Sequence, residues 1–420
     1  MTRAVGLLGL GVIVLICFLL SENRHRVDWR TVVLGIALQF LFAILLLGIP
    51  ALGISSPAYA LFDSFNRAVL AVISYSDQGA IFLFGDLAQN DKYGFILAFR
   101  ALPTIIFFSA LMGVLYHLGI MQRIVYGIAV IMHRTLRVSG AEALAASAEI
   151  FVGQTESPLM IRPYMDKLTR SELLALMTGG MATVAGGVLA AYVGMLSPIL
   201  PNIAGHLLTA SIMAAPAALV LSKLMLPETE VPATLGKVEL HQEKTAVNLI
   251  DAAAVGASEG THLAINVGGM LIAFVALMAL VNGLFTQLGG WLGLEAILGQ
   301  PLTLELLLGW LFAPLAFLLG IPSHEVLAVG QLLGKKLVLN EFVAYMDLAK
   351  IGGTLSERTV IIASYALCGF ANFSSIAIQL GGTGSLAPRR RPDIARLGMK
   401  ALLAGTLATC MTAAIVGLLI

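Results

Sequence analysis

Runs of about 20 apolar residues recur along the whole 420-residue chain, with no long polar stretch between them. A helix of that length crosses the hydrocarbon core of a bilayer, and helices satisfy their own backbone polar groups in lipid. Only 12% of the residues are charged, about half of what ordinary soluble domains carry. The sequence therefore predicts an all-α polytopic membrane protein and excludes a soluble enzyme.

About eight of these runs are long enough to be full spans, and the basic residues decide their orientation. Loops on the cytoplasmic side of a membrane carry an excess of Lys and Arg. Placing five basic loops there puts both termini on the outer, periplasmic side, together with the long segment 50–94. The predicted spans lie near 4–20, 31–49, 95–118, 173–198, 205–226, 262–285, 359–381 and 398–419, and the cytoplasmic loops at 21–30, 119–140, 162–172, 222–246 and 386–400.

Two further segments, 141–172 and 300–350, are partly apolar but are interrupted by polar residues beside glycine or proline. The first breaks at 153–158. The second breaks at 320–323 and later reaches the polar pair at 340–341. An unpaired backbone group in lipid costs several kcal/mol, so such breaks must face protein or a water-filled cavity. Both segments are predicted to be re-entrant helical hairpins.

Each hairpin is followed by a span that is itself broken by small and polar residues, at 183–187 and at 369–375. One more span follows each. This succession occurs twice, entering from opposite sides, and is typical of the inverted repeats of secondary transporters. The predicted parts are scaffold spans with a cytoplasmic interfacial helix at 1–140, a first transport half at 141–226, a cytoplasmic loop, scaffold span and outer segment at 227–299, and a second transport half at 300–420.

Three glutamates, Glu149, Glu156 and Glu341, lie where the chain is expected at membrane depth. A charged side chain there costs about 2.5–3.5 kcal/mol on insertion scales, so these residues are functional candidates. A solvated hairpin tip, or for Glu341 an ion pair with Lys336, is the alternative. The lining suits an uncharged hydroxyl- or amide-bearing solute better than an anion or a cation. Its neutral groups are Gln154, Thr155, Asn340, Asn372 and Ser375.

Three separated sequence motifs contain these polar residues and resemble the motifs of a known family. They read GQTESPL at 153–159, GKKLVLNEFVAY at 334–345 and GFANFSS at 369–375. In this order they resemble the concentrative nucleoside transporter family, over about residues 95–420. The resemblance implies a homotrimer of eight-span protomers in the bacterial inner membrane. Each protomer would move a nucleoside inward with a cation, by an elevator-like shift of its hairpin-bearing domain.

The resemblance also implies roles for single residues. A carboxylate accepts two hydrogen bonds from neighbouring hydroxyls, which suits Glu341 to a ribose and disfavours a free base. The polar groups at the base leave open which of uridine, cytidine or adenosine is preferred. By this likeness Gln154, Thr155, Glu156 and Val188 would contact the nucleobase, and Glu341, Asn372, Ser375 and Phe370 the ribose.

The predicted cation site departs from the pattern of the family. Positions that resemble a sodium site in characterised members here read Glu149, Val152, Thr183 and Val184, with Glu149 in place of an asparagine. A buried glutamate can carry a proton, and an ionised one can bind sodium as a hard oxygen ligand. We therefore expect coupling to H⁺, with Na⁺ at these four residues as the alternative.

Two other functions fit the sequence less well. An uncoupled nucleoside channel would need neither hairpins nor an ion site. A membrane enzyme using Glu156 and Glu341 as acid and base lacks an activated nucleophile. The net charge of +1 provides no basic surface for nucleic acid, and no cofactor is expected, because the three cysteines lie inside apolar runs without metal-ligand spacing.

Overall fold

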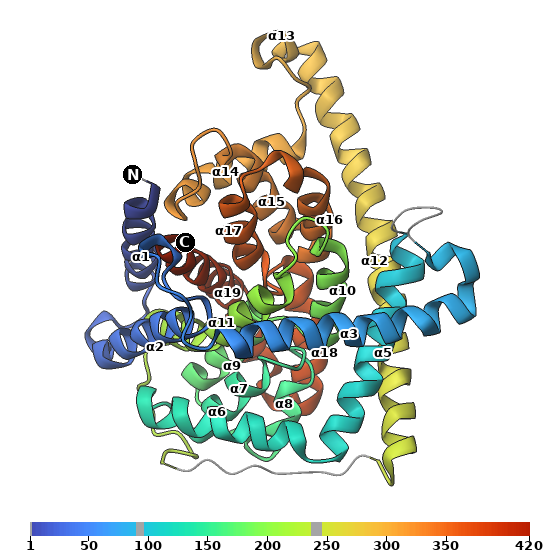
Figure 1. Cartoon of the computed structure of the whole chain (residues 1–420). Helices are drawn as coiled ribbons and strands as arrows, with labels where there is room; N and C mark the ends of the chain where they lie inside the picture. The colour runs from blue at the N-terminus through green and yellow to red at the C-terminus, as the bar shows by residue number, and fades with distance from the viewer. Residues whose placement is uncertain (1, 90–95, 237–245) are drawn as a thin grey trace.

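The computed structural model describes residues 2–89, 96–236 and 246–420 (Figure 1). Residues 90–94 of the predicted outer segment and 237–245 of the loop 222–246 lie outside these ranges. The described residues form helices and no strand, with one isolated bridge between Ile49 and Ile54, which confirms the all-α prediction. The helices are α1 (Thr2–Leu19), α2 (Trp29–Leu47), α3 (Tyr59–Phe84), α5 (Leu97–His117), α6 (Ile120–Leu136), α7 (Gly140–Ala148), α8 (Ser157–Met160), α9 (Arg170–Ala182), α10 (Gly186–Leu196), α11 (Ile203–Met225), α12 (Leu249–Trp291), α13 (Leu294–Leu298), α14 (Leu304–Leu318), α15 (Val326–Val338), α16 (Glu341–Ile351), α17 (Glu357–Leu367), α18 (Phe373–Leu386) and α19 (Arg391–Leu419).

Seven helical stretches among the described residues are long and apolar enough to cross a membrane. Six of them match predicted spans. The seventh, Tyr59–Ala88, falls in the segment 50–94, where no span was predicted. The predicted span 4–20 is the shorter apolar helix α1, and 359–381 is divided between α17 and α18. The breaks at 183–187 and 369–375 are confirmed, because α9 gives way to α10 and α17 to α18 there.

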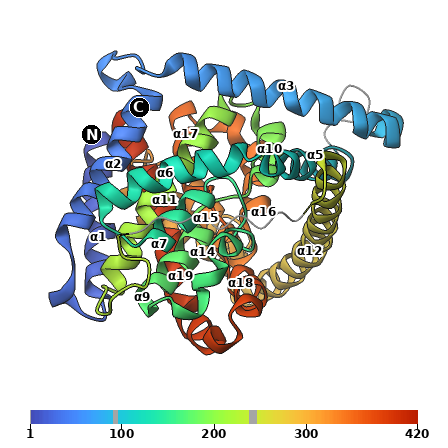
Figure 2. The same cartoon turned by 90° about the horizontal axis from the view of Figure 1, so that it is seen from below.

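The spans divide into an enclosed group and an outer group. In the apolar 18-residue segment of the stretch formed by α9 and α10, 94% is buried, whereas in the corresponding segment of α12 only 17% is buried. Helices α11 and α19 are enclosed like α9 and α10, while α3, α5 and α12 lie outside (Figure 2). With 43 residues, α12 is about 64 Å long. The enclosed helices carry the site described below, and the outer ones frame it.

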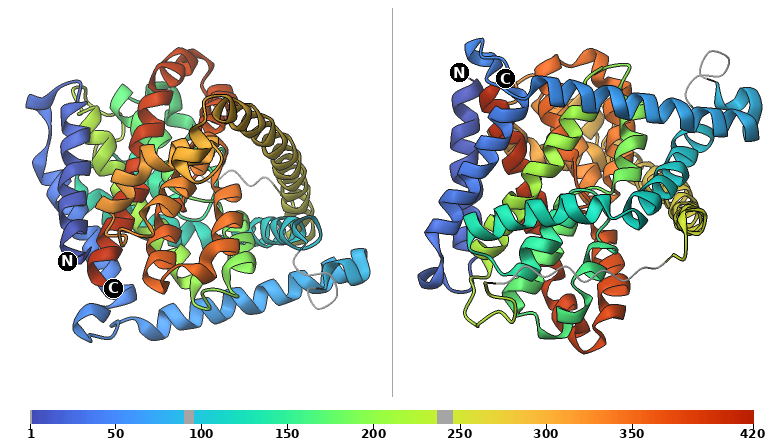
Figure 3. Two further views of the ribbon diagram at one scale, coloured as in Figure 1. Left: turned by 90° about the horizontal axis from the view of Figure 1, so that it is seen from above. Right: turned by 60° about the horizontal axis from the view of Figure 1, so that its bottom comes forward.

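The predicted cytoplasmic loops gather at one end of the molecule. The backbone N–H of Glu22 donates to the carbonyl of Met225 (3.0 Å), and its carboxylate lies 3.5 Å from Arg170 and pairs with Lys400. These residues belong to four of the five loops. The two termini lie near each other at the opposite end (Figure 3). The clustering of basic loops that the sequence predicts is therefore present in the fold.

The first hairpin leaves the basic end as α7, whose start is fixed by a reciprocal pair of bonds between Ser139 and Glu142. It turns at 149–156 and returns through α8. The second hairpin comes from the end that holds the termini and consists of α15 and α16, with its turn at Leu339 and Asn340. The break predicted at 320–323 is a different turn. It joins α14 to α15 beside the last turn of α19. The sequence Gly-Ile-Pro-Ser does not distinguish the two cases, because glycine, proline and serine favour any turn that follows a helix end.

Two outer helices, α5 and α12, pack through glycine. A Cβ atom on Gly256 would lie 2.5 Å from the carbonyl oxygen of Ser109, and one on Gly260 would lie 2.8 Å from the Cα of Ile106. Small residues four apart let two helix backbones approach closely, which is a common way for helices to associate in membranes. The position of α12 beside the rest of the protein therefore depends on this pair of glycines.

We expect Gly256→Leu to lower the stability of the protein, because the new side chain has to displace α5. Overpacking of this kind costs about 1–3 kcal/mol, measured as a fall in the midpoint of thermal unfolding in detergent. Gly269→Leu is the matched control on the same helix, since no described atom lies within 4 Å of a Cβ there. Equal midpoints for the two variants would contradict the glycine contact.

Candidate functional site

The breaks in the two interrupted spans are held together by backbone hydrogen bonds. The N–H of Phe370, between α17 and α18, donates to the carbonyl of Thr183, between α9 and α10 (3.2 Å). The N–H of Gly186 donates to the carbonyl of Phe151 in the turn of the first hairpin (2.9 Å). Three segments far apart in sequence thus meet where their helices are interrupted. This junction is where the predicted site residues lie.

Glu341 lies at the turn of the second hairpin and is bound by neutral donors. The hydroxyl of Tyr192 donates to one carboxylate oxygen (2.8 Å) and the amide nitrogen of Asn372 to the other (3.2 Å). The Asn372 amide oxygen also caps α18 by accepting from the N–H of Ser375 (2.9 Å). Because that oxygen is committed to the cap, the amide nitrogen must point to Glu341. Only 4% of Glu341 is exposed.

Lys336, the alternative partner of Glu341, makes other contacts. Its ammonium group donates to the carbonyl of Ala366 and to the hydroxyl of Thr409, both at 2.9 Å. Within the described part of the chain no ion pair joins it to Glu341. The carboxylate of Glu341 therefore keeps acceptor capacity for further hydroxyl groups.

The turn of the first hairpin reaches α18 through Gln154. Its amide nitrogen donates to the hydroxyl of Ser375 (3.1 Å), and its amide oxygen accepts from the amide nitrogen of Gln379 (3.1 Å). Gln379 also donates to the carbonyl of Met177 on α9 (2.9 Å). The predicted base side and the predicted ribose side are thus connected directly, because Ser375 and Asn372 begin the same helix.

The other residues predicted at the base differ in exposure. Thr155 and Glu156 are exposed at the turn of the first hairpin, and Val188 is buried in α10. One Glu156 carboxylate oxygen accepts from the N–H of Gly153 (3.3 Å), which closes the turn. No hydrogen bond among the described residues joins Thr155 or Glu156 to the Gln154 chain. The structure therefore places them at the edge of the cluster rather than inside it.

Glu149 is buried in the same hairpin, with 1% of its surface exposed. The Ser157 hydroxyl donates to one carboxylate oxygen (2.9 Å), and the other oxygen has no hydrogen-bond partner among the described residues. The Thr183 hydroxyl donates to the carbonyl of Gly179 (2.9 Å). Val152 and Val184, the other predicted members of the cation site, are also buried. An unpartnered, buried carboxylate oxygen fits either a proton or a bound cation.

Two successive glycines of α9 receive the polar side chains of the hairpin. A Cβ atom on Gly179 would lie 1.8 Å from a carboxylate oxygen of Glu149, and one on Gly180 would lie 2.7 Å from the Cβ of Gln154. Only glycine leaves room for both side chains. The candidate cation site and the candidate substrate site therefore rest on adjacent residues of one helix.

Sequence reasoning missed two residues of this cluster, Tyr192 and Gln379. Tyr192 follows Val188 by four residues on α10, and Gln379 follows Ser375 by four on α18. Residues four apart lie on the same face of a helix. A search one turn beyond each predicted site residue would have found both.

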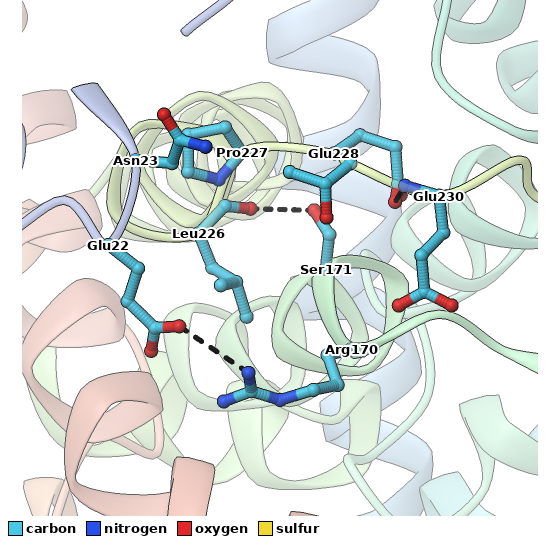
Figure 4. A pocket seen from close by; sticks show the side chains of 9 residues that line it. Glu22, Asn23, Arg170, Ser171, Leu226, Pro227, Glu228 and Glu230 are labelled. Atoms are coloured by element: carbon cyan, nitrogen blue, oxygen red, sulfur yellow. Dashed lines mark hydrogen bonds and ion pairs between the residues drawn. The ribbon is translucent and has the colours of Figure 1, made fainter. Parts of the chain in front are cut away.

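A pocket of about 230 Å³ lies elsewhere, at the basic end (Figure 4). Arg170 points to Glu22 across it, and the Ser171 hydroxyl donates to the carbonyl of Leu226 (2.7 Å). None of the predicted site residues lines it. This pocket lies between loops and is separate from the candidate site at the helix breaks.

Two hairpins that enter from opposite ends and meet two broken helices define a secondary membrane transporter. The family follows from comparison with known proteins. Residues 8–87 match the family model described as the N-terminus of Na⁺ dependent nucleoside transporters, 98–199 the model described as nucleoside recognition, and 206–417 the C-terminus of the same transporters. The chain belongs to the concentrative nucleoside transporter family, a family of cation-coupled transporters and not of enzymes.

The sequence is similar to those of known proteins over nearly its full length. It is 49% identical to the uncharacterized transporter YutK of Bacillus subtilis, covering 99% of both chains, and 42% identical to the nucleoside permease NupC of Helicobacter pylori, covering 98% of this chain and 96% of that one. Human solute carrier family 28 member 3 is 41% identical, over 98% of this chain and 59% of that protein. A solved structure of CNTnw in an inward-facing, substrate-bound state matches with a TM-score of 0.90 and 43% identity, covering 100% of this chain and 98% of that one.

We expect Gly179→Ala to destabilise the protein by about 1–3 kcal/mol, because the methyl group would occupy the space of the Glu149 carboxylate. In a Glu149→Ala background the same change should cost much less, since the clash is gone. The four proteins form a double-mutant cycle, measured by thermal unfolding. Gly194→Ala on α10, where no described atom lies within 4 Å of a Cβ, is the control and should leave stability unchanged or raise it. Additive effects in the cycle would exclude the contact.

Proposed function

We propose that the protein imports nucleosides across the bacterial inner membrane together with protons. The nucleoside ribose binds at Glu341, and the base binds at the turn of the first hairpin. The observation that supports this most is the buried Glu341 carboxylate, whose hydrogen-bond donors among the described residues are all neutral and which lies next to Asn372 and Ser375. The test is binding and transport by the purified protein, as set out below.

The chemistry of a ribose fits this cluster. Two neighbouring hydroxyls can donate to one carboxylate, while amide and hydroxyl groups at Asn372 and Ser375 satisfy the remaining sugar oxygens. A free base forms none of these charge-assisted hydrogen bonds with Glu341, so it should bind far more weakly than its nucleoside. Gln154, Thr155, Glu156 and Val188 then face the base, and Phe370 lies beside the sugar. These roles follow from the family likeness and from the position of the cluster.

Coupling to protons is supported by the surroundings of Glu149. The ionised form would be a buried charge with one neutral donor, Ser157, and one unpartnered oxygen. Such a charge is costly unless it is neutralised. A proton neutralises it without further ligands. Glu149, Thr183 and the carbonyls of Val152 and Val184 form the alternative, a sodium site in which Glu149 is an anionic ligand.

The remaining features of the proposal concern the whole protein. Residues 141–226 and 300–420 move as the transport domain against a scaffold drawn from 1–140 and 227–299, in an elevator-like shift. The protein acts as a homotrimer, with both termini periplasmic. The grouping of basic loops at one end supports this orientation. An uncoupled channel is disfavoured because the family is cation-coupled.

We expect Glu341→Gln to weaken uridine binding, because the ribose loses a charged acceptor. Hydrogen bonds to charged groups contribute about 1.5–3 kcal/mol, which corresponds to a rise in Kd of about 10- to 150-fold. Calorimetry on the purified protein measures it. Glu325→Gln is the matched control. Glu325 precedes α15, is also buried, and accepts hydrogen bonds from Ser356 and Thr359 at the start of α17. An unchanged Kd in Glu341→Gln would refute the ribose assignment.

For coupling, we expect wild-type uptake into proteoliposomes to rise as the external pH falls, because protonation of Glu149 loads the carrier. Uptake should collapse with a protonophore and ignore the replacement of sodium by choline. Glu149→Gln should lose accumulation against a gradient but keep binding and exchange, since the side chain is permanently neutral. Glu325→Gln should accumulate normally. Uptake that requires sodium at constant pH and ignores the protonophore would assign Glu149 to sodium instead.

A further inference from the structure

One continuous hydrogen-bond chain runs from the backbone of α9 to the start of α18. Gln379 donates to the carbonyl of Met177 (2.9 Å) and to the amide oxygen of Gln154 (3.1 Å). Gln154 in turn donates to the hydroxyl of Ser375 (3.1 Å). The chain passes through three side chains, and only Gln154 and Ser375 belong to the predicted substrate site. Gln379 stands behind them.

The direction of this chain is fixed by its first member. A backbone carbonyl can only accept, so the Gln379 atom that faces Met177 must be the amide nitrogen. That nitrogen has two hydrogens, and the second one points to Gln154. The oxygen of Gln154 must therefore face Gln379, which turns its nitrogen toward Ser375. The Ser375 oxygen accepts from it, and the Ser375 proton remains free because no described group accepts it.

The packing supports a fixed arrangement. Gln379 is 1% exposed, and its amide oxygen has no partner among the described residues, so the two donated bonds alone set its orientation. A Cβ atom on Gly180 would lie 2.7 Å from the Cβ of Gln154 and 3.2 Å from the amide nitrogen of Gln379. Both glutamines are thus pressed against the same turn of α9. A hydrogen bond also joins their two amides, so the orientation of one sets that of the other.

We propose that Gln379 is a positioning residue that orients the Gln154 amide and so makes Ser375 a hydrogen-bond donor toward the sugar of the nucleoside. This inference rests on the proposed ribose site and explains why its serine donates a hydrogen bond to the sugar rather than accepting one. Gln379 itself need not touch the substrate. It sets which atoms of Gln154 and Ser375 are left to meet the nucleoside.

Gln379→Glu is the sharpest test. A carboxyl group has at most one proton, so it cannot donate to both Met177 and Gln154. Gln154 should then reverse and donate to residue 379, with its oxygen toward Ser375. The Ser375 proton is used on Gln154, and the serine can no longer donate to the sugar. Gln379→Met, which keeps the volume but has no donor, is the second variant should the first not fold.

The readout is the ratio of Kd values for uridine and its 2′-, 3′- and 5′-deoxy analogues. In the wild type, removal of the hydroxyl that accepts from Ser375 should weaken binding about tenfold. In Gln379→Glu this ratio should fall to about twofold or less, and in Gln379→Met it should also fall. Ser375→Ala should show the same loss, with no further change in the double variant, because both act on one bond.

Gln39→Glu is the matched control, because Gln39 is also a fully buried glutamine with an unpartnered amide oxygen, on α2 and bonded to Gly35 and Met411. It should keep the wild-type ratios. Unchanged ratios in a folded Gln379 variant, or additive effects with Ser375→Ala, would overturn the inference while leaving the ribose site intact. If wild-type protein bound uracil as well as uridine, the proposed function would fail instead, and the inference with it.

Discussion

The rest of the structure depends on how the interrupted helices satisfy their backbone polar groups inside an apolar protein. Each break leaves N–H and carbonyl groups without partners in their own helix, and an unpaired group inside an apolar protein is costly. The chain meets this requirement by bringing breaks together: Phe370 bonds to Thr183, and Gly186 to Phe151. The side chain of Asn372 closes the start of α18. The residues of the candidate site therefore lie at a junction that the interrupted backbones stabilise.

The same junction links the two candidate sites mechanically. Glu149 and Gln154 are five residues apart in one hairpin, and they contact the successive glycines Gly179 and Gly180. A small shift of the hairpin against α9 changes the surroundings of both side chains at once, because packed interiors leave no slack between them. In the proposed mechanism, loading of a proton or cation and loading of the substrate thus act on the same turn of α9. This gives a physical basis for cation coupling that does not require a direct contact between the two ligands.

Sequence patterns predicted the spans and both broken helices because apolar runs and clusters of glycine with polar residues are local signals. They failed where the fold depends on a distant partner. Tyr192 and Gln379 carry no motif of their own. Their importance comes from residues on other elements, which one chain read in order does not reveal.

The two buried carboxylates of the junction differ in their hydrogen-bond partners. Glu341 accepts one hydrogen bond on each carboxylate oxygen, from Tyr192 and from Asn372. Among the described residues Glu149 has Ser157 and no cation. On the proposed roles, Glu341 keeps acceptor capacity for hydroxyl groups, whereas Glu149 has one carboxylate oxygen that no described residue satisfies. This difference supports the proposal that the coupling ion binds at Glu149 and the neutral nucleoside at Glu341, because an uncompensated charge is costly to carry through a bilayer.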